Sequence, residues 1–140
     1  MIVMSPEEHD RLIARTSHVP HLAAAMLVGL LGRSGGKADD LCGPGFRDAT
    51  RIAAGSEDLW HDIVKTNRRF VGQELDALAR LLARVRAMIG RGDFKGLRGF
   101  LASSRKRRND FNVPFDPSTS LPSSQSFAVA RRAGQRGTPP

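Results

Sequence analysis

A long helical repeat in the middle of the chain restricts most strongly what this sequence can fold into. From Ser56 to Gly90, apolar side chains recur at alternating spacings of three and four residues, and no proline interrupts them. This pattern predicts one helix from Glu57 to Ile89, about 33 residues and roughly 50 Å long. Its apolar seam comprises Val64, Asn67, Val71, Leu75, Leu78, Leu82, Val85 and Ile89.

A helix of that length exceeds what a small domain can cover. The chain has 140 residues and a mass of 15.2 kDa, enough for one hydrophobic core and too little for two full domains. We therefore expect part of the seam to pack against a second copy, which makes the protein a homodimer through the long helix. Asn67 is the polar position on the seam, and it either sets the register of paired helices or forms local hydrogen bonds.

The first part of the chain predicts two helices separated by a proline. Ser5 can cap a helix that begins at Pro6, with Glu8 at the third position of a capping box. Pro20 lacks the backbone donor that would continue this helix, so the helix kinks or stops there. Residues 21–31 are apolar on all sides, which is typical of a helix surrounded by protein, and glycines at 32–36 end it.

Caps also mark the remaining elements. Residues 46–54 predict a short helix ended by Gly55, and Ser56 caps the long helix that follows. Asp93 can cap a last helix that reaches about Arg108. With no strand pattern and no internal repeat, the expected fold class is all-α: a helical dimerisation domain over residues 1–111 with one long helix. Residues 112–140, rich in proline, serine and glycine, predict a disordered basic tail.

The net charge of +8 is concentrated in the tail. Residues 101–140 hold seven Lys and Arg against two Asp, whereas basic and acidic residues are mixed before them. A nucleic-acid interface clusters its basic residues on one helix face beside aromatic or amide side chains, so the sequence disfavours nucleic acid as a partner. If the tail did bind nucleic acid, the affinity would depend strongly on salt and be lost on deleting residues 105–140.

Cysteine and hydropathy point to a cytoplasmic protein without a membrane partner. A single cysteine excludes an internal disulfide, and the chain has no signal-peptide pattern at its start. The most apolar stretch, residues 22–31, is about half of the roughly 20 residues that cross a bilayer.

Histidines around the proline form the first candidate site. Asp10, Ser17 and His21 are seven and four residues apart, so on an unbroken helix they share one face, with His9 and His18 nearby. A zinc site is disfavoured because structural zinc normally takes four ligands with several cysteines among them, and we expect no metal. Two interpretations stay open: a ligand site, or histidines that pack around the proline kink.

A second candidate lies at residues 43–53, where glycines precede a short helix. Arg47 and Arg51 are one turn apart, so two guanidinium groups could receive a dicarboxylate. The alternative is a solvated helix in which both arginines pair weakly with Asp48. A third segment, residues 32–37, resembles a phosphate loop only superficially, because its glycine spacing is wrong and it follows a helix. No glycine-rich dinucleotide motif between a strand and a helix occurs in the chain.

Together, four ordered motifs resemble the prephenate/arogenate dehydrogenase family. They are His9-Asp10, then Ser17-His18-Val19-Pro20-His21, then Gly45-Phe46-Arg47-Asp48-Ala49-Thr50-Arg51-Ile52-Ala53, and finally Leu59-Trp60 followed by Asn67. The resemblance covers about residues 5–110. It implies the helical half of such an enzyme, in which two helical domains intertwine as the dimer and the substrate lies between this half and a nucleotide-binding Rossmann domain.

The resemblance also implies roles for individual residues. Arg51 is similar to the arginine that holds a substrate carboxylate, and Arg47 and Asp48 fall at positions that can reach across the dimer. The substrate-binding residues it implies are Arg51, His21, Ser17, His18 and Arg47, and those that support the site are His9, Asp10, Asp48 and Trp60.

The family's reaction is an oxidative decarboxylation of prephenate or arogenate in tyrosine biosynthesis, with hydride passing to NAD or NADP. The hydroxyl-activating histidine and the cofactor site belong to the nucleotide-binding half, so we expect no catalytic residue in this chain and no cofactor bound by it alone. We expect a fragment or a split gene product whose Rossmann partner lies in the same or a separate chain. The alternative is a helical homodimer that binds an aromatic-pathway metabolite without chemistry.

Overall fold

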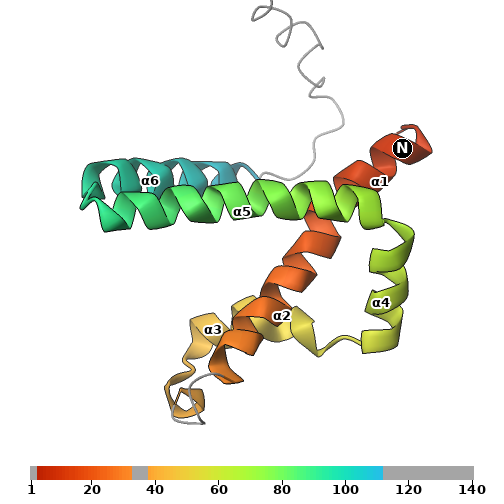
Figure 1. The fold of residues 1–140 in the computed structure, drawn as a ribbon, viewed down its shortest axis with the longest axis horizontal. Coiled ribbons are helices and arrows are strands. Elements are labelled where there is room, and N and C mark those ends of the chain that lie inside the picture. Colours follow the sequence, from red (N-terminus) through yellow and green to blue (C-terminus); the bar gives the residue numbers. More distant parts are fainter. Residues whose placement is uncertain (1–2, 33–37, 112–140) are drawn as a thin grey trace, which may run out of the picture. The chain divides into compact units, whose positions relative to one another are not determined.

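The computed structural model describes residues 3–32 and 38–111, and every regular element in these ranges is helical (Figure 1). The all-α prediction is therefore confirmed. The predicted helix stop at 32–36 is confirmed at Gly32, which follows the last residue of a helix, whereas residues 33–36 and the predicted tail at 112–140 lie outside the described residues. By internal contacts the chain forms two units, Met1–Phe94 and Lys95–Pro140, of which the first carries all the candidate site residues.

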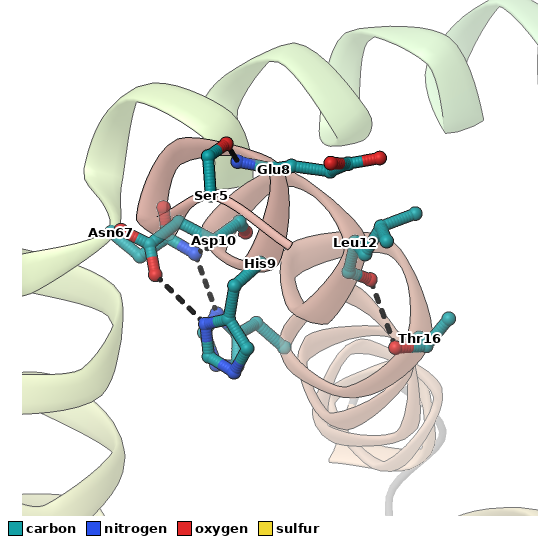
Figure 2. A network of polar contacts seen from close by, with 8 residues as sticks. Ser5, Glu8, His9, Asp10, Leu12, Thr16 and Asn67 are labelled. Atoms are coloured by element: carbon teal, nitrogen blue, oxygen red, sulfur yellow. Dashed lines mark hydrogen bonds and ion pairs between the residues drawn. The ribbon is translucent and has the colours of Figure 1, made fainter. Parts of the chain in front are cut away.

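The first unit begins with one bent helix made of three parts. These are α1 (Pro6–Ile13), a π-turn η1 (Ala14–His18) and α2 (Val19–Leu31). The Ser5 hydroxyl accepts a hydrogen bond from the Glu8 amide at 3.1 Å, so the predicted cap is confirmed (Figure 2).

The wide π-turn has a local cause in the residues around Pro20. The proline ring has no N–H and clashes with a regular preceding turn, and the Val19 amide bonds back to the Ala14 carbonyl, one residue further than in an α-helix. The Thr16 hydroxyl also donates to the Leu12 carbonyl at 2.9 Å, a side-chain bond that bends helices (Figure 2). The predicted interruption before Pro20 is thus a π-turn.

The long helix is shorter than predicted. Its first part is a separate helix, α4 (Glu57–Thr66), and α5 (Arg68–Gly90) is the long helix, with 23 residues. Figure 1 shows α4 turning steeply away from α5. Asn67 lies between them with φ −105° and ψ 26°, outside the helical range, and its side chain bonds to α1 instead. The prediction of one helix from Glu57 was wrong because this tertiary bond competes with the local pattern.

A small core forms where α5 crosses the bent helix at η1. Ala14 is fully buried there, and its small side chain lets the two helices approach closely. Arg15 of η1 reaches Glu74 of α5 with two hydrogen bonds of 2.8 Å. The buried apolar residues of the described part are Ala14, Val19, Ala24, Val71 and Met88.

Helix α2 is apolar on all sides, as predicted, but the described residues do not cover all of it. Met26, Leu27, Val28 and Leu30 are between 41% and 59% exposed. Among the described residues, the expectation that this helix is surrounded by protein is therefore not met.

Short elements pack against the other side of α2. They are η3 (Asp39–Leu41), α3 (Pro44–Thr50) and a 3₁₀ turn η4 (Arg51–Ala54), of which α3 and η4 contact α2 directly. Ser56 caps α4 by accepting the Leu59 amide at 3.4 Å, as predicted.

The second unit contains α6 (Phe94–Asp110), where the Arg107 guanidinium lies over the ring of Phe111 at 5.2 Å. Gly92, just before it, has φ +67°, a conformation that glycine adopts without strain. In the described part of the chain, no helix is both long and apolar enough to span a membrane.

Candidate functional site

A stacked pair of rings forms the centre of the candidate site. His21 of α2 is only 6% exposed, and its imidazole lies flat on the indole of Trp60 from α4, with ring centroids 3.5 Å apart and planes 11° apart. Trp60 itself is half-buried. The resemblance puts His21 in the pocket and Trp60 in its support, and the structure brings the two into direct contact.

Gly55 makes room for this stack. A Cβ atom built on Gly55 would lie 2.6 Å from Nε1 of Trp60 and 3.3 Å from Cε1 of His21. Its φ of −68° suits any residue, so glycine is needed at this position for space and not for backbone freedom. Gly55 was expected only as a helix stop, and the sequence offers no local signal for this second role.

His18 meets the same indole from another direction. Its ring lies edge-on to Trp60, with centroids 6.2 Å apart and an interplanar angle of 81°. His18 is 9% exposed, and loss of water around the ring lowers the pKa of His18, an effect that the nearby negative charge of Asp10 opposes and His9 reinforces. We therefore expect the neutral form of His18 at pH 7.

Asn67 connects this cluster to α1. Its amide nitrogen donates to the backbone carbonyl of Asp10 at 2.7 Å and lies 3.3 Å from Nδ1 of His18 (Figure 2 shows the Asp10 end). At 8% exposure Asn67 is buried, and its amide nitrogen lies within hydrogen-bond distance of both partners. Of the two interpretations of Asn67, the structure supports hydrogen bonding, although the partners lie 57 and 49 positions away.

The π-turn changes which residue reaches the cluster. A wider turn rotates the following residues back by roughly one position relative to an α-helix. His18 therefore takes the buried place, whereas Ser17 is only half-buried. The predicted face of Asp10, Ser17 and His21 assumed an unbroken helix, and for Ser17 that assumption was wrong.

His9 and Asp10 form an exposed pair at the edge of the cluster. Nδ1 of His9 lies 3.1 Å from a carboxylate oxygen of Asp10, and both side chains are more than half exposed (Figure 2). Asp10 contributes to the cluster through its carbonyl and its charge. In the described residues, no group of three or more His, Cys, Asp or Glu is arranged to hold a metal ion.

The arginines lie on the elements that pack against α2. Arg51 begins the 3₁₀ turn η4, is exposed, and has no ion pair with any residue of the described ranges. Arg47 donates from Nε to the Cys42 carbonyl at 3.1 Å and so fastens the preceding loop. Asp48 is exposed on α3. The structure thus brings together His18, His21, Trp60 and the Asp10 backbone, and places the Arg51 turn against the helix that carries His21.

One buried atom of the cluster lacks a partner. Nδ1 of His21 is fully enclosed and has no hydrogen bond to any described residue. An unsatisfied buried polar atom costs about 1–3 kcal/mol, so such an atom marks a place where a ligand, a water molecule or another chain can bind.

Fold and site together define an all-helical domain with an enclosed cluster of histidine and tryptophan rings, beside an arginine that has no acidic partner in the described ranges. Residues 5–103 match the sequence family described as prephenate dehydrogenase, dimerization domain. The chain belongs to this family, and the resemblance seen in its motifs is confirmed.

Similar proteins agree with this assignment. The chain is 32% identical to prephenate dehydrogenase of Bacillus subtilis over 111 residues, which is 77% of this chain and 30% of that protein. It is 34% identical to cyclohexadienyl dehydrogenase of Zymomonas mobilis over 110 residues, 76% of this chain and 38% of that protein.

Solved structures share the fold. Prephenate dehydrogenase from A. aeolicus, in complex with hydroxyphenyl propionate and NAD+, superposes with a TM-score of 0.72 at 29% identity, covering 78% of this chain and 39% of that one. Arogenate dehydrogenase from Synechocystis gives a TM-score of 0.71 at 24% identity, covering 79% of this chain and 41% of that one, and supports the fold alone. The chain thus spans about a third of the length of its curated relatives.

Proposed function

We propose that this domain supplies substrate-binding residues and the dimer interface to a prephenate or arogenate dehydrogenase. The reaction is the oxidative decarboxylation of prephenate, or of arogenate, in tyrosine biosynthesis. The observation that carries the proposal is the enclosed, unpartnered Nδ1 of His21 in a ring cluster, on a helix against which the Arg51 turn packs. Family membership supports the proposed substrate class, since relatives of this chain are named prephenate dehydrogenase and cyclohexadienyl dehydrogenase.

The chemistry of the cluster suits a ligand with a ring and a carboxylate. Arg51 offers a planar, permanently charged fork that matches a carboxylate, and no described acidic residue occupies it. His21 offers a nitrogen for a single hydrogen bond, and its stack with Trp60 gives the cluster an aromatic character that suits an unsaturated ring. The related enzyme from A. aeolicus was solved with hydroxyphenyl propionate, a molecule with these two parts.

The predicted site residues divide by what they can do in this proposal. Arg51 and His21 bind the carboxylate, and His18 offers a further hydrogen bond. Ser17 and Arg47 line the approach, the latter while holding its loop through the Cys42 carbonyl. His9, Asp10, Asp48 and Trp60 support the site.

We propose that NAD or NADP binds to a nucleotide-binding domain that is the partner of this one. Dinucleotides bind where a strand, a glycine-rich loop and a helix meet. In this proposal the chain's own residues bind and orient the substrate.

We propose that a homodimer forms through the faces that one chain leaves open. Leu82 and Ile89 of the seam are 67% and 55% exposed on α5, and the outer residues of α2 are also uncovered. Isolated exposed apolar residues are common, but large apolar side chains gathered on two helices are typical of an interface.

The test combines this chain with a nucleotide-binding domain from a relative such as the B. subtilis enzyme. We expect prephenate-dependent reduction of NAD or NADP by the mixture and none by this chain alone. Arg51→Ala should raise the substrate dissociation constant tenfold to a hundredfold, because a charge-assisted contact contributes about 1.5–3 kcal/mol. Arg51→Lys keeps the charge but loses the fork, so it should bind with intermediate affinity.

Arg98→Ala on α6 is the matched control, since Arg98 is exposed and should leave binding unchanged. If Arg51→Ala bound prephenate as tightly as the parent chain, the proposed carboxylate site would be wrong. Arg51-dependent binding of prephenate without turnover in any mixture would favour the alternative, a helical homodimer that senses the metabolite.

A further inference from the structure

The buried amide of Asn67 constrains the protonation of His18. The Asn67 side chain, at the junction between α4 and α5, has its amide nitrogen near two partners. They are the carbonyl of Asp10 at 2.7 Å and Nδ1 of His18 at 3.3 Å. Both Asn67 and His18 are more than nine-tenths buried, so water does not readily replace either partner.

The carbonyl of Asp10 determines which way the amide faces. A backbone carbonyl oxygen only accepts hydrogen bonds, so the atom 2.7 Å from it must be the amide NH₂ group. The reversed amide would bring two oxygens, neither of which carries a hydrogen, to 2.7 Å from each other, and the two would repel. The orientation of the Asn67 amide therefore follows from the Asp10 carbonyl, which can only accept a hydrogen bond.

The amide orientation in turn determines the state of the imidazole. The NH₂ group of Asn67 donates and cannot accept, so Nδ1 of His18 must carry a lone pair and no hydrogen. A neutral imidazole without a hydrogen on Nδ1 carries it on Nε2. A doubly protonated ring would direct an N–H at the NH₂ group and break the contact.

We infer that Asn67 is a positioning residue that holds His18 as the neutral tautomer with its hydrogen on Nε2, so that His18 presents one hydrogen-bond donor and no charge to the ligand. This inference rests on the proposed function for its ligand. It separates two tasks within the site: Arg51 supplies positive charge, whereas His18 recognises an uncharged oxygen or completes the contacts of a carboxylate that Arg51 neutralises.

Long-range ¹H–¹⁵N correlation spectra of the full chain, labelled at its four histidines, read the tautomer directly. At neutral pH we expect the His18 ring to show an unprotonated Nδ1 and a protonated Nε2, with the signals assigned by their loss in His18→Gln. A hydrogen on Nδ1, or a doubly protonated ring, would overturn the inference.

The variant Asn67→Asp tests whether Asn67 determines the tautomer of His18. The carboxylate can only accept, so His18 should move its hydrogen to Nδ1 or become doubly protonated, and the affinity for hydroxyphenyl propionate in the two-domain mixture should fall about tenfold, as for one lost hydrogen bond. Asn109→Asp, the same change at an exposed position of α6, should leave the His18 signals unchanged. An unchanged His18 spectrum in a folded Asn67→Asp chain would also overturn the inference, and if that variant does not fold, the parent spectrum still decides.

Different results would reject the proposed function and the inference about the His18 tautomer. A His18 ring protonated on Nε2, in a mixture whose ligand binding does not depend on Arg51, would leave the tautomer assignment standing and reject the proposed function. Arg51-dependent binding with a His18 ring protonated on Nδ1 would do the reverse.

Discussion

At the scale of single residues, the site depends on a glycine, because a larger residue at position 55 would have no room for its side chain. Gly55 leaves the space into which the Trp60 indole fits, and the indole in turn covers His21. Three residues with different chemistry thus form one packed unit. Its tolerance to change is low because a methyl group on Gly55 would lie 2.6 Å from Nε1 of Trp60, well below van der Waals contact.

Gly55→Ala should therefore displace the indole from His21. Overpacking typically costs about 1–3 kcal/mol, and the lower entropy of the unfolded alanine chain offsets about 0.4–1 kcal/mol of this, so we expect a net loss of about 1 kcal/mol. Trp60 is the only tryptophan and the chain has no tyrosine, so the emission spectrum reports the stack and denaturant unfolding reports the stability. Gly72→Ala, with nothing within 4 Å, is the control and should be neutral or stabilising. An unchanged emission spectrum in Gly55→Ala would show that the stack does not need the glycine.

At the scale of elements, one ion pair ties the π-turn to α5. The Arg15 guanidinium makes a two-pronged contact with Glu74, whose side chain is 13% exposed while that of Arg15 is 65% exposed. The hydrogen bonds from Arg15, together with its charge, lower the pKa of Glu74 below its ordinary value, against the opposing effect of burial. The contact fixes α5 against the segment that carries His18.

Glu74→Gln should destabilise the chain by about 1 kcal/mol or less at neutral pH, since Arg15 is mostly solvated. Because the pKa of Glu74 is lowered by folding, its contribution is full above the ordinary value of 4.5 and is lost as the pH falls through the lower, folded value. Urea unfolding of parent and variant should thus differ at pH 7 and converge in acid. Glu7→Gln is the control, because its 3.5 Å pair with Arg69 is 70% exposed on both sides and should contribute almost nothing. A difference that grew toward low pH would contradict this account.

At the scale of the whole molecule, the described part leaves many large apolar side chains exposed. Five apolar residues form the core, whereas fifteen large apolar residues of the described part are exposed. Within α5, Val71 is 2% exposed whereas Leu82 is 67% exposed, so the seam is covered at Val71 and open at Leu82. The chain belongs to a family described as a dimerization domain, and the open seam agrees with the homodimer proposed above.

Leu82→Asp should convert a homodimer into monomers at micromolar concentration, because it places a charge in the apolar interface we propose without touching the chain's own core. Sedimentation velocity measures the change, and circular dichroism should show unchanged helix content. Leu41→Asp, at a position 85% exposed and away from α5, should leave the dimer intact. If the parent chain is a monomer, or if Leu82→Asp stays dimeric, the seam of α5 is not the interface.

Local sequence signals were sufficient for much of the fold. The cap at Ser5, the cap at Ser56 and the interruption before Pro20 all depend on atoms within a few residues of one another, so a single sequence reveals them. The four ordered motifs likewise indicate the family by residue identity and spacing alone. Helix type, most helix starts and the family were therefore determined by the sequence itself.

Contacts between distant residues decided the rest. The break at Asn67, the burial of His18 in place of Ser17, and the fit of Trp60 against Gly55 and His21 each depend on side chains from different helices. A helical period predicts only which residues share a face, and it cannot show that a buried amide gains more from a carbonyl 57 positions away than from continuing the helix. This difference in energy arises only once the chain has folded, because only then are the Asn67 amide and the Asp10 carbonyl both shielded from water.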